Sequence, residues 1–206
     1  MGEAGVALAA SRLETVAMLL NQRVADGGGV FPTADLAIDG DIETALATRP
    51  AGDVEDEFIE ILASRRRRDA EAGRALYGPH RSDLLVYHRD KMQAARLCST
   101  GEQKALLIGL VLANARALAN ASGLTSGLGR AGPRGHNGSR APLILLLDEI
   151  AAHLDPERRA ALFDIIDGLG FQAFMTGTDK SLFSAWGGGA QYFETRDGSL
   201  CEADLT

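Results

Sequence analysis

The chain has 206 residues, of which 46% are hydrophobic and 5% aromatic, and its formal net charge is −7. This length suits one domain, or one domain with an appendage, and the acidic balance excludes a uniformly basic nucleic-acid binder but not a local basic patch. The two cysteines, Cys98 and Cys201, lack the spacing of a metal or redox site, so we expect a reduced, cytoplasmic compartment.

The first 77 residues predict a small, mostly helical unit. Apolar residues recur at near-helical spacing from Glu3 to Ala25, and the glycines at positions 27–29 end that helix. Alternating apolar residues predict a short strand over Ala34–Ile42. A charged helix is predicted from about Asp53 to Leu76, with one apolar face and with Arg65–Arg68 crowding the other.

The composition changes at Gly78-Pro79, where we place the start of a second unit, residues 78–206. Its first predicted elements are a strand over Asp83–His88 and a hairpin partner within Lys91–Leu97. The clearest helix of the chain is predicted over Glu102–Asn120. Because this helix is apolar around most of its circumference, we expect it to be deeply buried.

The rest of the second unit alternates strands with helices, which favours an α/β fold with a mainly parallel sheet. A stretch rich in Gly, Ser, Pro and Arg at about 121–142 predicts a flexible loop. The five aliphatic residues Leu143–Leu147 predict a strand buried on both faces. A helix over Pro156–Leu169 and a strand over Gln172–Thr176 follow. No membrane partner is expected, because the apolar run Ala105–Ala113 is too short and too rich in Ala and Gly.

Two acids, Asp148 and Glu149, follow the predicted aliphatic strand directly. The carboxyl ends of strands are where α/β sheets bind ligands. Asp148 could hold Mg²⁺, which takes one or two carboxylates together with phosphate oxygens, and Glu149 could act as general base on a water molecule. The alternative is a pair of solvated acids that only end a strand.

The segment Ser99–Gln103 opens the predicted buried helix. One interpretation is a capping box, in which Ser99 caps the helix and Glu102, three residues on, reaches back. The other is a phosphate site, because a helix N-terminus carries free N–H groups and partial positive charge, and Gly101 lets the backbone approach closely. Both interpretations can hold at once.

Asp155 precedes a proline and so suits the start of a helix. The four arginines Arg65, Arg66, Arg67 and Arg68 could contact DNA phosphates. The alternative is a solvated helix face, because charge runs on helices are usually solvated and several acids lie nearby in the sequence.

The order of these motifs resembles the C-terminal part of ABC-type ATPase heads of the SMC and Rad50 kind. Ser-Thr-Gly-Glu-Gln at 99–103 is followed by an aliphatic strand with Asp-Glu and then by Ala-His-Leu-Asp at 152–155. Within that group, Gly-Pro-His-Arg-Ser-Asp at 78–83 and Phe-Met-Thr-Gly-Thr-Asp at 174–179 are similar to the RecF family. The likeness is most specific from Gly78 to Asp179.

This resemblance implies the C-terminal half of an ABC-type head, preceded by part of a helical second lobe. It implies an ATP-dependent homodimer that binds single-stranded or gapped double-stranded DNA and works with recombination mediators of the RecO and RecR type. Asp148 would serve Mg²⁺ and Glu149 the attacking water. Residues that would serve nucleotide held by the partner subunit are Ser99, Gly101, Glu102, Gln103 and Asp155.

Two departures from the family pattern stand out. No Gly-x-x-x-x-Gly-Lys-Ser/Thr motif occurs, and none of the three lysines, Lys91, Lys104 and Lys180, follows the required glycine. The region Thr176–Thr178, where many relatives carry a switch histidine, has none, so we assign no sensor there. We therefore expect a C-terminal fragment without ATPase activity of its own. The alternatives are a non-catalytic module that binds DNA or a partner, or an ABC-type ATPase subunit of another system such as a transporter.

Overall fold

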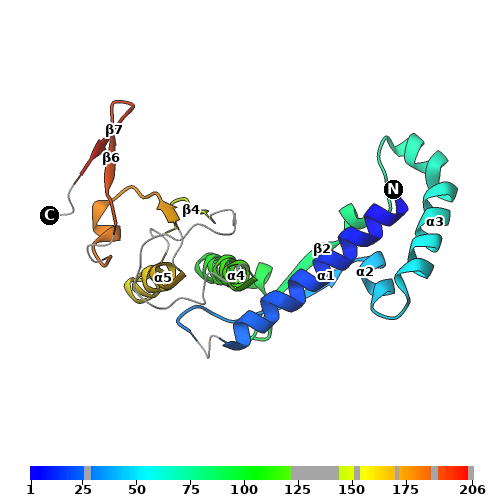
Figure 1. Cartoon of the computed structure of the whole chain (residues 1–206), viewed down its shortest axis with the longest axis horizontal. Coiled ribbons are helices and arrows are strands. Elements are labelled where there is room, and N and C mark those ends of the chain that lie inside the picture. Colours follow the sequence, from blue (N-terminus) through cyan, green and yellow to red (C-terminus); the bar gives the residue numbers. More distant parts are fainter. Residues whose placement is uncertain (26–28, 122–143, 151–153, 170–171, 187–189, 204–206) are drawn as a thin grey trace, which may run out of the picture. The chain divides into compact units, whose positions relative to one another are not determined.

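A computed structural model describes residues 1–25, 29–121, 144–150, 154–169, 172–186 and 190–203 of the chain (Figure 1). The chain separates into two compact units, Met1–Gly27 with Thr33–Cys98 (unit 1) and Gly28–Pro32 with Ser99–Thr206 (unit 2). The predicted α/β fold is confirmed, since helices combine with sheets and one sheet is parallel. The flexible loop predicted at about 121–142 lies, from residue 122 on, outside the described residues.

Unit 1 combines helices with one antiparallel sheet in the order β1-β2-β3. Its elements are α1 (Gly2–Ala25), β1 (Ala34–Asp39), α2 (Asp41–Leu46), α3 (Ala51–Ala72), the 3-10 turn η1 (Pro79–Arg81), β2 (Asp83–His88), β3 (Gln93–Ala94) and the 3-10 turn η2 (Ala95–Leu97). Leu36 lies opposite Val86, and His88 lies opposite Gln93. The predicted hairpin of the strand over 83–88 with a partner in 91–97 is therefore confirmed.

The border between the two compact units lies between Cys98 and Ser99. The predicted division of the chain lies earlier, at Gly78. The difference arises because β2 pairs along its whole length with β1, from His88 opposite Ala34 to Asp83 opposite Asp39. A division into a helical lobe and an ATPase lobe at Gly78 stays a prediction.

Unit 1 has its own apolar core. The buried members are Val6, Ala9, Ile42, Val54 and Phe58, which come from α1, α2 and α3. The helices α1 and α3 approach closely, because a Cβ added at Gly5 would lie 2.5 Å from the Phe58 ring. The end of α3 is set by a glycine at position 73 with a φ of 65°, a left-handed cap that stops a helix without steric cost.

A buried carboxylate joins three parts of unit 1. Glu43 of α2 is 2% exposed, and its Oε2 accepts a hydrogen bond of 2.7 Å from the Ser82 hydroxyl. The Arg12 guanidinium of α1 lies 3.5 Å from Oε1 of Glu43 and donates to the carbonyl oxygen of Pro79. Because an unpaired buried carboxylate is strongly destabilising, these contacts fix the segment around Pro79 against α1 and α2.

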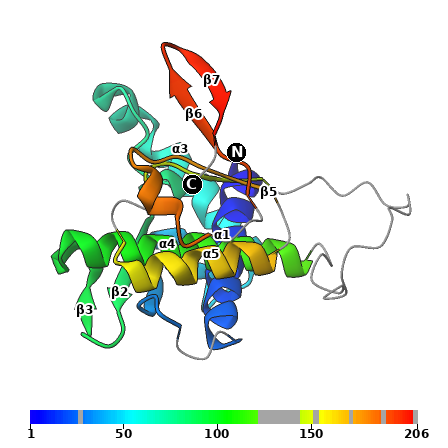
Figure 2. The ribbon, with the colours of Figure 1, turned by 90° about the vertical axis from the view of Figure 1, so that its left-hand side faces the viewer.

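Unit 2 contains a parallel pair of strands and a separate antiparallel hairpin. Its elements are α4 (Thr100–Ala121), β4 (Ile144–Leu147), α5 (Pro156–Leu169), β5 (Gln172–Met175), the 3-10 turn η5 (Lys180–Phe183), β6 (Phe193–Arg196) and β7 (Ser199–Glu202). β4 and β5 are parallel, with Leu147 opposite Met175. α4 and α5 lie side by side, as Figure 2 shows. The hairpin β6–β7 turns at Asp197 and Gly198.

The helix predicted over 102–120 is confirmed as α4, and much of it is buried. Ala105, Leu106, Ile108 and Leu112 are each less than 5% exposed, whereas Leu107 is 61% exposed. Throughout the described ranges, no helix combines the length and apolarity that crossing a bilayer requires.

Only one face of β4 is buried. Leu145 and Leu147 join α4 and α5 in the core of unit 2, whereas Ile144 is 49% and Leu146 is 73% exposed. Phe174 of β5 is 53% exposed. The prediction that this strand is buried on both faces is therefore wrong for the chain as described. The physical reason is that α4 and α5 cover one side of the β4–β5 pair and the described residues leave the other side open.

Candidate functional site

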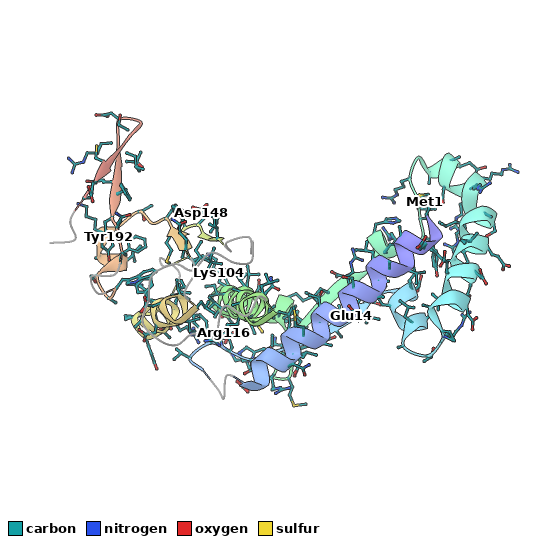
Figure 3. All side chains as sticks on the ribbon, viewed as in Figure 1. Met1, Glu14, Lys104, Arg116, Asp148 and Tyr192 are labelled. Carbon is teal, nitrogen blue, oxygen red and sulfur yellow. The ribbon has the colours of Figure 1, made fainter. Side chains whose placement is uncertain are left out.

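Asp148, labelled in Figure 3, and Glu149 lie at the carboxyl end of β4, and both side chains are exposed. The core beneath them joins β4 to α4, through Leu145 and Leu147 on the strand and Ile108 on the helix. The strand thus carries both acids to the sheet edge where α/β proteins bind ligands, as the sequence predicted.

Thr176 lies one residue past β5 and contacts three consecutive residues at the end of β4. Its N–H donates to the carbonyl oxygen of Leu147 at 3.0 Å. Its Oγ1 accepts from the Glu149 N–H at 3.0 Å and donates to Oδ1 of Asp148. Glu149 has a φ of 50°, in the left-handed region that residues other than glycine rarely adopt.

The turn after Thr176 is held by aromatic packing. A Cβ at Gly177 would lie 2.9 Å from two ring atoms of Phe183, so a larger residue at this position would require the Phe183 ring to move. The ring of Phe163 lies 6.5 Å from that of Phe183 and 4.7 Å from that of Trp186, centroid to centroid. These contacts anchor the segment that presents the Thr176 hydroxyl.

The capping box predicted at the start of α4 is present. The Ser99 N–H and hydroxyl both donate to Oε2 of Glu102, at 3.0 and 2.9 Å, and the Glu102 N–H lies 3.4 Å from Oγ of Ser99. The N–H of Gln103 donates to the Ser99 carbonyl oxygen at 2.9 Å. A Cβ placed on Gly101 would meet no atom within 4 Å, so the backbone there faces open space. The second interpretation, a phosphate site, is compatible with this geometry and stays a prediction.

Asp155 caps α5, as its position before a proline predicted. Its Oδ1 accepts from the Arg158 N–H at 2.8 Å, and its carbonyl oxygen accepts from the Arg159 N–H at 3.0 Å. The neighbouring residues 151–153, which belong to the same predicted motif, lie outside the described residues. A role for Asp155 beyond helix capping stays a prediction.

The four arginines of α3 do not share one face. The Arg65 guanidinium lies 4.8 Å from the centroid of the Tyr77 ring, and Arg67 pairs with Glu71 at 3.0 Å. Consecutive residues on a helix point about 100° apart, so a run of four spreads around most of the circumference. The predicted crowding of Arg65–Arg68 on one face is therefore wrong, while their contact with DNA stays a prediction.

Three ionisable side chains among the described residues have shifted pKa values. One is Glu194, whose pKa is lowered mainly by the hydrogen bond from Arg196. Burial raises the pKa of the Tyr77 phenol; Asp41 and Glu57 add to that effect, and Arg65 opposes it. Hydrogen bonds from Ser181, the backbone N–H first, lower the pKa of Asp179. The causes of these shifts do not include Asp148 or Glu149, so the shifts describe local structure rather than the candidate site.

The donor set fits a metal that takes few protein ligands. Throughout the described ranges, no group of three or more His, Cys, Asp or Glu side chains could hold an ion by itself. Asp148 presents one carboxylate at an exposed strand end, with one oxygen on the Thr176 hydroxyl. Mg²⁺ is commonly bound in this manner, by one or two carboxylates with water and phosphate oxygens completing the octahedron.

Sequence reasoning missed Thr176. A signal was present, since the predicted strand over 172–176 was expected to lie in the same parallel sheet as the aliphatic strand before Asp148. Its carboxyl end therefore had to reach the same edge. The segment Thr176–Thr178 contains no histidine, but it contains the hydroxyl that reaches Asp148.

No family model matches the chain. The DNA replication and repair protein RecF of Mesorhizobium japonicum is 51% identical over 202 residues, which cover 97% of this chain and 48% of that protein. RecF of Rhizobium leguminosarum bv. trifolii is 50% identical over 204 residues, 98% of this chain and 50% of that protein. The chain thus spans about half the length of the curated relatives it matches.

Solved structures of the recombination mediator protein RecF of the RecFOR pathway share the fold. The RecF-ATPrS structure has a TM-score of 0.62 at 17% identity, covering 98% of this chain and 48% of the RecF chain. The RecF-ATP structure has the same TM-score and coverage at 15% identity. At such identities the likeness establishes the fold alone, while the relationship itself comes from the sequence comparisons.

Proposed function

This chain is a RecF-family sequence that corresponds to the C-terminal portion of those proteins, and from this premise we propose its function. We propose that it forms part of an ATP-dependent DNA-binding protein of recombinational repair and replication-gap processing. The observation that carries the proposal is the Asp148-Glu149 pair at the carboxyl end of a parallel strand, in a chain half identical to RecF over 97% of its length. We place its action in the cytoplasm.

Asp148 is the proposed ligand of Mg²⁺, and Glu149 the proposed general base. When bound, the metal neutralises charge that develops on the transferred phosphoryl group. Glu149 orients and deprotonates the attacking water, a role that a carboxylate beside a phosphate site performs well. Both side chains are exposed at one strand end, so they reach a ligand without rearrangement of the core.

The start of α4 is proposed to bind nucleotide held by a second copy of the protein in an ATP-dependent homodimer. Gly101 faces open space at a helix N-terminus, where free N–H groups favour a phosphate. The Ser99 hydroxyl now donates to Glu102, so contact with a phosphate requires it to exchange acceptors. Glu102, Gln103 and Asp155 are the remaining proposed contributors to this shared site.

The phosphate cradle is not part of this sequence, because no Gly-x-x-x-x-Gly-Lys-Ser/Thr motif occurs in its 206 residues. ATP therefore lacks its main binding element here, and we propose that the chain alone does not turn over ATP. The same observation favours a second candidate function, a non-catalytic module that contacts DNA or recombination mediators of the RecO and RecR type.

An ATPase assay with a complementing polypeptide tests the catalytic proposal. The chain alone is expected to show no Mg²⁺-dependent hydrolysis. A mixture with the P-loop-bearing half of a RecF relative is expected to hydrolyse ATP, and Glu149→Gln is expected to lower that rate at least about 100-fold. Glu157→Gln, an exposed acid of α5, serves as the control. Undiminished hydrolysis by Glu149→Gln would remove Glu149 as the base.

Fluorescence anisotropy with a gapped duplex at low salt tests the DNA proposal. The described residues include no ion-pair partner for Arg66 or Arg68, whereas Arg67 pairs with Glu71. We expect Arg66→Ala and Arg68→Ala each to weaken binding and to reduce the slope of log K against log salt by about 0.9. Arg67→Ala is expected to have a smaller effect. Absence of binding both by the chain and by its complemented form would count against DNA as a partner.

A further inference from the structure

The Thr176 hydroxyl uses its donor and an acceptor position at the same time. A hydroxyl has one O–H to donate and two lone pairs that accept. Oγ1 of Thr176 accepts from the Glu149 N–H at 3.0 Å and donates to Oδ1 of Asp148. The approach of the Glu149 N–H occupies one side of the oxygen, so the hydroxyl proton is directed toward Asp148.

The backbone of Glu149 needs support from its surroundings. A φ of 50° is sterically unfavourable for a residue with a Cβ, and such conformations persist only where neighbouring contacts hold them. The contact at the Glu149 N–H is Thr176 Oγ1. The N–H of Thr176 bonds in turn to the Leu147 carbonyl oxygen at 3.0 Å, which ties the hydroxyl to the strand that carries both acids.

From this geometry we propose that Thr176 is the positioning residue of the hydrolytic site, with its hydroxyl holding both the Asp148 carboxylate and the left-handed backbone of Glu149. This inference rests on the proposed function, in which Asp148 binds Mg²⁺ and Glu149 acts on the attacking water. With Oδ1 of Asp148 on Thr176, the other carboxylate oxygen, Oδ2, is left available to bind a metal. Mg²⁺ demands near-ideal octahedral geometry, so the orientation of this carboxylate affects its affinity.

Three variants separate the hydroxyl from the rest of the side chain. Thr176→Val keeps the shape and removes both hydrogen bonds, Thr176→Ser keeps the hydroxyl, and Thr178→Val is a matched control two residues away. Thr176→Ala replaces the valine variant if Trp186 fluorescence shows that valine lowers the melting temperature strongly. All are made in the 206-residue chain.

The first readout is hydrogen exchange at the Glu149 amide, measured by NMR. We expect Thr176→Val to lose protection at this amide by about tenfold, the equivalent of one hydrogen bond. Thr176→Ser and Thr178→Val are expected to match the wild type. Unchanged protection in Thr176→Val, or equal loss in Thr176→Ser, would overturn the proposal.

The second readout is titration with Mn²⁺, followed by paramagnetic broadening of the Asp148 and Glu149 amide signals. Loss of a group that orients a metal ligand typically lowers metal affinity 10–100-fold, so we expect the Mn²⁺ midpoint of Thr176→Val to rise by about that factor. A midpoint within twofold of wild type would overturn the positioning of Asp148. A third outcome is that protection of the Glu149 amide depends on the Thr176 hydroxyl, while Mn²⁺ broadens the Asp148 and Glu149 signals in none of the proteins. This outcome would support positioning by Thr176 and would count against the proposed metal role.

Discussion

Each unit contains a carboxylate that is hydrogen-bonded to a hydroxyl, but the two pairs have opposite surroundings. In unit 1, Glu43 is 2% exposed and is held by Ser82 and Arg12. In unit 2, Asp148 is exposed at a strand end and is held by Thr176. The buried pair has its charge neutralised internally and so fixes structure, whereas the exposed pair leaves its charge available to a ligand.

The largest expected effect concerns the strand that carries Asp148. Leu147 is 3% and Leu146 is 73% exposed, so Leu147→Ala is expected to cost about 2–5 kcal/mol of unfolding free energy. Leu146→Ala is expected to stay within about 0.5 kcal/mol. Urea unfolding followed by the fluorescence of Trp186, the single tryptophan of the chain, measures both. Equal losses of unfolding free energy in the two variants would mean that the two faces of β4 do not differ in burial.

The comparison of the two carboxylates predicts that removing Glu43 lowers stability much more than removing Asp148. Glu43→Ala leaves Ser82 and Arg12 without their buried acceptor, and we expect a loss of about 1–3 kcal/mol. Asp148→Ala is expected to change stability by less than about 0.5 kcal/mol, because the side chain is exposed. Hydrogen exchange resolved by unit measures each loss where it arises. A larger loss in Asp148→Ala than in Glu43→Ala would reverse the assignment of structural and functional carboxylate.

The smallest expected effect is a pH dependence from Asp179, another hydrogen-bonded carboxylate of unit 2. Hydrogen bonds from Ser181, the backbone N–H first, lower its pKa below the ordinary value of an aspartate. A lowered folded-state pKa stabilises the protein above the unfolded-state pKa, and the contribution is lost as the pH falls through the folded-state pKa. Asp179→Ala should therefore be slightly less stable at neutral pH and converge with the wild type in acid. Thermal unfolding at a series of pH values checks this, with Asp164→Ala as control.

Local features were predictable from the sequence, and distant ones were not. The capping box needs only Ser99 and Glu102, three residues apart, so its pattern is visible in one turn of helix. The Glu43–Ser82 contact spans 39 residues and the Asp148–Thr176 contact spans 28. Both depend on how separate elements pack, which no local pattern specifies.

Two predictions failed for reasons of geometry. An aliphatic run such as Leu143–Leu147 indicates that a strand can be buried, but the elements packed against it determine how many of its faces are covered. Within the described residues, only one face of this strand is covered. A run of four arginines indicates charge, but the helical repeat turns Arg65 toward Tyr77 and Arg67 toward Glu71. In both cases the composition correctly indicated the kind of residue, apolar or charged, but it did not indicate which way the side chains point.

The parallel pairing of β4 with β5 also bears on when the candidate site forms during folding. Leu147 and Met175 become neighbours only after α5 has completed the crossover between the two strands. Such non-local pairing is slow compared with helix formation. The hydrogen bond from Glu149 to Thr176 therefore belongs to the late steps of folding. A collapsed intermediate with α4 and α5 already packed would contain both acids and still lack the site.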